Sequence, residues 1–232
     1  MLNNSYKTKK GALIKIICIV GPTACGKTKL GVKLANKFNG EIISADSRQV
    51  YIGMDIGTGK DLCEYGKTPY HLIDIYSPKK QVTLADWQKL AINKIIELNA
   101  KNKTPFVVGG TGLYINSLVD GYILDNEKID QESREKLDST PLAKLQKILK
   151  HLDVNAYKQI DINNSRRIIR AIEIAKNNNS ISKPKRKKIF DSLILGITFE
   201  RDVINQRIDE RLKQRLEKEN MTGEIENLHK AG

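Results

Sequence analysis

The stretch Gly21-Pro22-Thr23-Ala24-Cys25-Gly26-Lys27-Thr28 decides the fold class of this chain, because it matches the phosphate-binding pattern G-x-x-x-x-G-K-[ST] in full. An apolar run before it, Ile14 to Val20, is typical of a buried strand. Apolar residues then recur every four positions from Leu30 to Phe38, which predicts a helix. In such a loop the backbone N–H groups and the helix N-terminus bind an anion, Lys27 adds a positive charge, and Thr28 offers a hydroxyl to a magnesium ion. The sequence therefore predicts a site for a diphosphate or larger polyphosphate.

Strand patterns alternate with helical patterns along much of the chain, which predicts an α/β fold: a P-loop-type parallel sheet flanked by helices. Further buried strands are expected at residues 41–45, 105–108 and 193–198, and a short extended piece at residues 70–75. Thr83-Leu84-Ala85-Asp86 is a capping-box signature, so a helix is expected to begin there.

The pattern changes near Asp120, because residues from about 125 to 161 are highly charged and helical in texture, with no strand signal. We therefore expect a small helical insertion at residues 122–162, and a catalytic core made of residues 1–121 and 163–232. A last helix is expected from about Asp202. It carries an apolar stripe and an arginine stripe, each with a spacing of four: Ile204, Ile208, Leu212 and Leu216; Arg207, Arg211 and Arg215.

The composition limits the classes of protein that the chain can represent. Its 232 residues suit one α/β domain with a modest addition, and no apolar run approaches the 18 residues of a membrane span. The start does not resemble a signal peptide, and the three cysteines lack metal-ligand spacing, so reduced thiols in a cytoplasmic protein are expected. The net charge of +13 suggests a polyanionic partner, most simply a nucleic acid, but a high-lysine proteome encoded by an AT-rich genome would explain it equally well.

The P-loop alone leaves the chemistry open. A P-loop hydrolase usually carries an acidic residue at the end of a later strand, whereas the strand at residues 105–108 ends in Gly109-Gly110. Asp46 instead follows the strand at residues 41–45. Because ligands bind at the carboxyl ends of parallel strands, Asp46 is expected near the P-loop. It could ligate magnesium, cap a turn or act as a general base.

Several blocks together give a family resemblance. The chain resembles tRNA dimethylallyltransferase, the IPP transferase family, in blocks that occur in the family's order. They are the P-loop, Glu41-Ile42-Ile43-Ser44-Ala45-Asp46-Ser47-Arg48-Gln49-Val50-Tyr51, Gly53 to Lys60, His71 to Asp74, Gly109 to Tyr114, and Asn163 to Glu173. The resemblance implies transfer of a dimethylallyl group from its diphosphate to N6 of the adenosine 3′ of the tRNA anticodon, with Mg²⁺ as cofactor.

The resemblance also implies roles for individual residues. Residues Gly21 to Thr28 would hold the diphosphate, with Thr23 in contact with it, and Asp46 would remove the proton from the adenine amino group. Arg211 matches an arginine near the reacting diphosphate, and Lys60 is expected to meet phosphate. Positions expected to bind the tRNA anticodon stem-loop are Asp46, Ser47, Arg48, Gln49, Thr111, Arg134, Arg166, Arg167, Ile168, Ile169 and Arg170. A monomer is expected.

The family pattern continues beyond Gly232, so a C-terminal part of the family is expected to be missing. The alternatives are an adenylate isopentenyltransferase acting on free AMP, ADP or ATP, a small-molecule kinase, and an inactive tRNA-binding form. The positive charge and the helical insertion favour tRNA over a free nucleotide.

Overall fold

The computed structural model of the chain describes residues 6–8, 11–124, 131–176 and 186–230. The chain forms two compact units. The first contains Met1–Tyr122 and Arg186–Gly232, and the second contains Ile123–Lys185.

The first unit is built on a parallel sheet of five strands in the order β3-β2-β4-β1-β5. Every pairing is parallel, and Ile17 of β1 lies between Phe106 of β4 and Leu193 of β5. The predicted α/β fold class is therefore confirmed. The strands are β1 (Ile14–Val20), β2 (Gly40–Ser44), β3 (Tyr70–His71), β4 (Thr104–Val108) and β5 (Phe190–Gly196).

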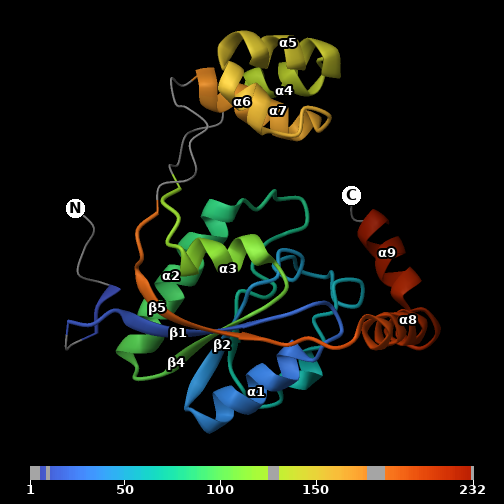
Figure 1. Cartoon of the computed structure of the whole chain (residues 1–232). Coiled ribbons are helices and arrows are strands. Elements are labelled where there is room, and N and C mark those ends of the chain that lie inside the picture. The colour runs from blue at the N-terminus through green and yellow to red at the C-terminus, as the bar shows by residue number, and fades with distance from the viewer. Residues whose placement is uncertain (1–5, 9–10, 125–130, 177–185, 231–232) are drawn as a thin grey trace. The chain divides into compact units, whose positions relative to one another are not determined.

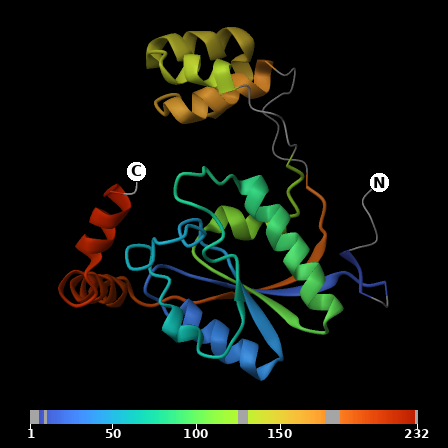
Figure 2. The same cartoon turned by 180° about the vertical axis from the view of Figure 1, so that it is seen from behind.

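Helices cover both faces of this sheet. Helix α1 (Lys27–Lys37) lies on one face, and α2 (Leu84–Ala100) and α3 (Gly112–Val119) lie on the other (Figures 1 and 2). Residues of β1 alternate between two apolar cores: Cys18 packs in a core with Trp87 of α2, while Ile19 packs in a core with Ala35 of α1. This two-sided burial explains why the strand is apolar along its length rather than alternating.

The predicted capping box at the start of α2 is confirmed. Thr83 Oγ1 accepts a hydrogen bond from the Asp86 N–H at 3.2 Å, and Asp86 Oδ2 accepts one from the Thr83 N–H at 3.0 Å. These bonds to Thr83 lower the pKa of the Asp86 carboxyl. The helix that results places Trp87 so that its Nε1 donates to the Ser44 carbonyl at 3.1 Å, which fastens α2 to the end of β2.

The described residues of the second unit form four helices with their own core. They are α4 (Gln131–Asp138), α5 (Leu142–Leu152), α6 (Val154–Gln159) and α7 (Ser165–Lys176). Ile168 and Ile172 of α7 pack with Leu145 and Leu149 of α5 in this core. The sequence placed residues from 163 onward with the catalytic core; α7 instead belongs to the second unit, because its apolar face is buried there.

Two helices follow β5, namely α8 (Arg201–Glu217) and α9 (Met221–Lys230). The predicted last helix corresponds to α8, whereas α3, α9 and the short 3-10 helix η2 (Leu62–Tyr65) were not predicted. None of the residues of α8 and α9, all of which are described, is buried, and the apolar stripe expected on α8 is largely exposed. Among the described residues, no helix is both long and apolar enough to cross a membrane.

Candidate active site

The P-loop has the backbone geometry that its glycines predict. Gly26 adopts a φ of 82°, in the left-handed region of backbone conformation that residues other than glycine rarely adopt. The Lys27 side chain folds back over the loop, and its Nζ donates to the Pro22 carbonyl at 2.5 Å. Helix α1 begins at Lys27, so its free N–H groups face the loop and favour an anion there.

Asp46 follows β2 after one intervening residue, Ala45, at the carboxyl edge of the sheet. Its Oδ1 accepts a hydrogen bond from the Arg48 N–H at 2.9 Å, which closes a turn and orients the carboxylate. None of the described residues donates a hydrogen bond to Asp46 Oδ2. The turn-capping role considered from the sequence is therefore present, and one oxygen remains free for a proton or a metal ion.

Strand β4 separates β1 from β2, and close packing at its carboxyl end explains why a glycine, Gly109, follows it. A Cβ atom added to Gly109 would lie within 2.8 Å of the Ala45 Cα and would clash with the Ala45 carbonyl. The Ala45 carbonyl itself accepts the Thr111 N–H at 3.1 Å. An acidic side chain at position 109 would not fit, because the chain segment that presents Asp46 occupies that space.

The P-loop, Asp46 and α8 line one cavity of about 720 Å³. Thr23, Lys27 and Thr28 come from the P-loop and its helix, Asp46 from the end of β2, and Arg211 from α8. The predicted diphosphate site, the proposed base and the matched arginine therefore share a single space. Figure 1 shows α8 beyond the edge of the sheet where these loops emerge.

Arginines form the α8 wall of the cavity. Arg211 pairs with Asp61 and donates to the Gly59 carbonyl at 3.4 Å, and Arg215 Nη2 lies 3.3 Å from Asp61 Oδ1. Arg207 also lines the cavity, with its guanidinium 4.1 Å from the centre of the Phe199 ring. Positive charge on both walls makes the cavity suitable for a polyphosphate.

A magnesium ion fits the oxygen donors of this cavity. Thr28 supplies a hydroxyl, and Asp46 has a free carboxylate oxygen. The described residues contain no cluster of three or more histidine, cysteine or acidic side chains that could form a protein cage. Magnesium is often held by one or two protein ligands together with substrate phosphate and water, so the two oxygen donors named above could hold it. Burial raises the pKa of the Tyr65 phenol, which also lines the cavity.

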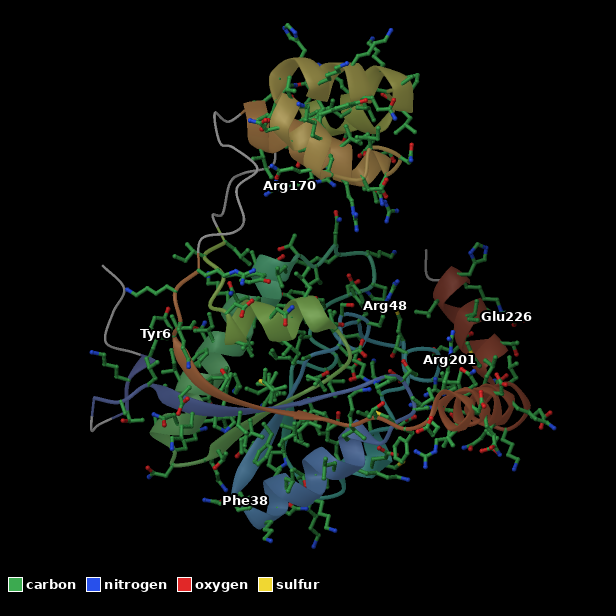
Figure 3. All side chains as sticks on the ribbon, in the orientation of Figure 1. Tyr6, Phe38, Arg48, Arg170, Arg201 and Glu226 are labelled. Carbon is green, nitrogen blue, oxygen red and sulfur yellow. The ribbon has the colours of Figure 1, made fainter. Side chains whose placement is uncertain are left out.

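The predicted tRNA-contact residues of the first unit lie together at the carboxyl edge of the sheet, after β2 and β4. Arg48 is exposed and is labelled in Figure 3. The Ser47 N–H donates to Thr111 Oγ1 at 3.0 Å, so these two residues are neighbours although 64 positions separate them. The Gln49 amide is already used inside the protein: its Oε1 accepts from the Ser44 hydroxyl at 3.0 Å, and its Nε2 donates to the Gly59 carbonyl at 2.9 Å.

The predicted contacts of the second unit separate into two groups. Arg166, Arg167 and Arg170 are exposed on α7 (Figure 3 labels Arg170), and Arg134 of α4 pairs with Glu173 at 3.4 Å. In contrast, Ile168 and Ile169 are buried in the core of the unit, so their side chains are not available to RNA. The sequence could not separate these groups, because a family position does not show which face of the helix is buried.

Lys60 differs most from its expected role. Instead of meeting phosphate, its side chain is only 1% exposed, and its Nζ pairs with Asp55 and Asp74 and donates to the Tyr51 carbonyl at 2.7 Å. Lys60 therefore supports the loop from inside. Sequence reasoning missed Asp61, Tyr65 and Glu224 as neighbours of the site, since each is placed by a contact between distant parts of the chain.

The fold and the site define a P-loop protein of the α/β class, with a carboxylate and arginines facing the phosphate-binding loop. The IPP transferase family model matches residues 49–232, and the Isopentenyl transferase model matches residues 14–68. The chain is 45% identical to tRNA dimethylallyltransferase 2 of Shewanella sediminis, over 92% of this chain and 71% of the relative. It is 42% identical to tRNA dimethylallyltransferase 1 of Geotalea daltonii, over 95% of this chain and 71% of that relative.

Solved structures agree with these relatives. The chain is similar to the full-length tRNA isopentenylpyrophosphate transferase from Bacillus halodurans, with 41% identity, a TM-score of 0.67, and coverage of 94% of this chain and 71% of that one. It is also similar to a eukaryotic dimethylallyltransferase acting on tRNA, with 28% identity, a TM-score of 0.81, and coverage of 94% and 56%. The chain belongs to the tRNA dimethylallyltransferase (IPP transferase) family.

Proposed function

We propose that this chain transfers the dimethylallyl group of dimethylallyl diphosphate to N6 of the adenosine 3′ of the tRNA anticodon, and releases diphosphate. The observation that carries the proposal is the shared cavity, in which the P-loop faces Asp46 and Arg211. A phosphate-binding loop beside a free carboxylate oxygen suits a reaction in which a diphosphate leaves while an amine loses a proton. The family membership supplies the identity of donor and acceptor.

In the proposed reaction, N6 of adenine forms a bond to C1 of the allyl group while the bond from C1 to the diphosphate oxygen breaks. The proton of N6 passes to Asp46 Oδ2. Negative charge grows on the departing diphosphate, where the P-loop N–H groups, Lys27 and Arg211 stabilise it. Thr23 lies in the same cavity and is proposed to contact the diphosphate. Magnesium held by Thr28 would neutralise further diphosphate charge.

The target base must leave its stack to enter a cavity at the edge of a sheet. We propose that Ser47, Arg48 and Thr111 contact the RNA around the extruded base, and that Gln49 acts by shaping the loop. Exposed arginines of α7 and Arg134 are proposed to bind the anticodon stem-loop through its phosphates. We propose that the active form is a monomer that acts in the cytoplasm on its tRNA.

The experiment supplies the protein with magnesium and labelled dimethylallyl diphosphate, in parallel with unmodified tRNA and with AMP. Label in tRNA, at the adenosine 3′ of the anticodon, supports the proposal. Label only in AMP identifies an adenylate isopentenyltransferase, and tight tRNA binding without transfer identifies an inactive tRNA-binding form. Either of these two results would overturn the proposal.

A further inference from the structure

Helices α8 and α9 are not held to the rest of the first unit by an apolar core. None of their residues is buried, and Val203, Leu212 and Leu216 of α8 are 39%, 47% and 49% exposed. Burial of apolar surface is the usual force that fixes a helix in place, and it is weak here. Polar contacts must therefore set where Arg211 stands in the cavity.

Two carboxylates make these polar contacts, and both involve the loop of residues 53–61, called here the glycine loop. Asp61, at its end, pairs with Arg211 and Arg215 of α8. Glu224 of α9 accepts three successive backbone N–H groups of the loop. Its Oε2 accepts from Asp55 at 2.8 Å and from Ile56 at 2.7 Å, and its Oε1 accepts from Gly57 at 2.9 Å.

A carboxylate that accepts three N–H groups is a strong and directional contact, because bonds to a charged acceptor are about twice as strong as neutral ones. The glycine loop can transmit the restraint from Glu224 to the cavity, because contacts with Lys60 and Gln49 also fix the loop from the side of the protein core. Lys60 pairs with Asp55 within the loop, and Gln49 Nε2 donates to the Gly59 carbonyl at 2.9 Å. Residues 57 to 59 and Asp61 then form part of the cavity wall.

We infer that Glu224 is a positioning residue for the diphosphate site. Its carboxylate fixes the glycine loop, the loop presents Asp61, and Asp61 holds Arg211 facing the P-loop. Arginine has five N–H donors, so the contact with Asp61 through Nη2 leaves others for a diphosphate. This inference rests on the proposed function of the cavity as a diphosphate site, and it assigns α9 a role in binding the leaving group.

The test compares Glu224→Gln with Glu226→Gln. Glu226 is exposed on the same helix and is labelled in Figure 3, so its variant controls for the loss of one charge from α9. Binding of magnesium pyrophosphate is measured by calorimetry, and exchange of the backbone amides of residues 55–57 by hydrogen exchange. We expect Glu224→Gln to weaken pyrophosphate binding about tenfold and to speed exchange of these amides. Glu226→Gln should leave both unchanged.

A thermodynamic cycle separates positioning from general damage to the fold. In an Arg211→Met background, Glu224→Gln should have no further effect on pyrophosphate affinity, because the arginine through which it acts is gone. If Glu224→Gln does not fold, Asp61→Asn breaks the other end of the same contact chain and should also weaken pyrophosphate binding about tenfold. Unchanged affinity in whichever of the two variants folds overturns the inference, as does an equal loss in Glu226→Gln.

Failure of the inference differs from failure of the proposed function. If the wild-type protein transfers the prenyl group to tRNA but Glu224→Gln binds pyrophosphate normally, only the role of Glu224 is refuted. If the wild-type protein neither binds pyrophosphate nor transfers the group, the proposed function fails, and the inference that rests on it fails with it.

Discussion

Asp46→Asn is the sharpest test of the proposed chemistry, because the turn at the end of β2 separates the two oxygens of this side chain. Oδ1 accepts the Arg48 N–H at 2.9 Å, and no residue in the described part of the chain donates to Oδ2. An asparagine can keep its carbonyl oxygen on the Arg48 N–H and turn its NH₂ group toward the cavity. The turn then survives, but the group that faces the adenine can no longer accept its proton.

The expected losses in transfer rate and in stability follow from the separate roles of Oδ2 and Oδ1. A positioned general base is worth about 10²- to 10⁴-fold in rate, so Asp46→Asn should lose that factor while its stability stays near that of the wild type. Asp46→Ala should lose the same factor and also the turn hydrogen bond, worth about 0.5–1.5 kcal/mol of stability. The pair of variants thus separates the proton acceptor from the turn.

The assay is single-turnover transfer of labelled dimethylallyl groups to an anticodon stem-loop RNA, with enzyme in excess. Binding of the RNA is followed separately by fluorescence anisotropy, and unfolding by thermal melting. We expect both Asp46 variants to bind RNA and only the alanine variant to melt earlier. A wild-type transfer rate in folded Asp46→Asn would refute the assignment of Asp46 as the base.

Three further predictions address the P-loop, the glycine loop and the cap of α2. Lys27→Met should weaken binding of dimethylallyl diphosphate by about tenfold or more, measured as KM and by pyrophosphate inhibition, because a charged donor to the diphosphate is lost. Lys60→Met should lower the free energy of unfolding by about 1 to 3 kcal/mol in denaturant titrations, because the Tyr51 carbonyl and two partly exposed carboxylates lose the hydrogen bonds of the buried ammonium group. Hydrogen bonds from Thr83 lower the pKa of Asp86, so its contribution to stability is present above its ordinary pKa of 3.8 and is lost as pH falls through the lower folded value. Asp86→Asn should therefore reduce the dependence of stability on pH below 3.8.

Each of these predictions has a control and an outcome that contradicts it. Lys33→Met removes a charge from an exposed position of α1, and an equal loss of donor affinity there would show a general charge effect. An unchanged unfolding free energy in Lys60→Met would mean that its ion pairs are not stabilising. For Asp86, an acid stability profile identical to that of the wild type would show that the capping box does not carry the effect.

Much of the fold could be predicted from the sequence, because local chemistry decides it. The P-loop glycines and the apolar run before them predict strand β1 and helix α1, and the Thr83–Asp86 pair predicts the start of α2. Strand periodicity also located Asp46 at the carboxyl edge of the sheet. Helices α3 and α9 were missed because α3 directly follows a glycine-rich turn and α9 lacks a buried face.

Only the tertiary structure decided the contacts between segments that are far apart in the chain. The sequence by itself determined the phosphate loop, the alternation of strands and helices and the family motifs, since these depend on neighbouring residues. The strand order placed the glycine end of β4 between the P-loop and Asp46. Long-range ion pairs and hydrogen bonds buried Lys60 and set Arg211 and Glu224 on the glycine loop, because a charge finds its partner only after the chain has folded.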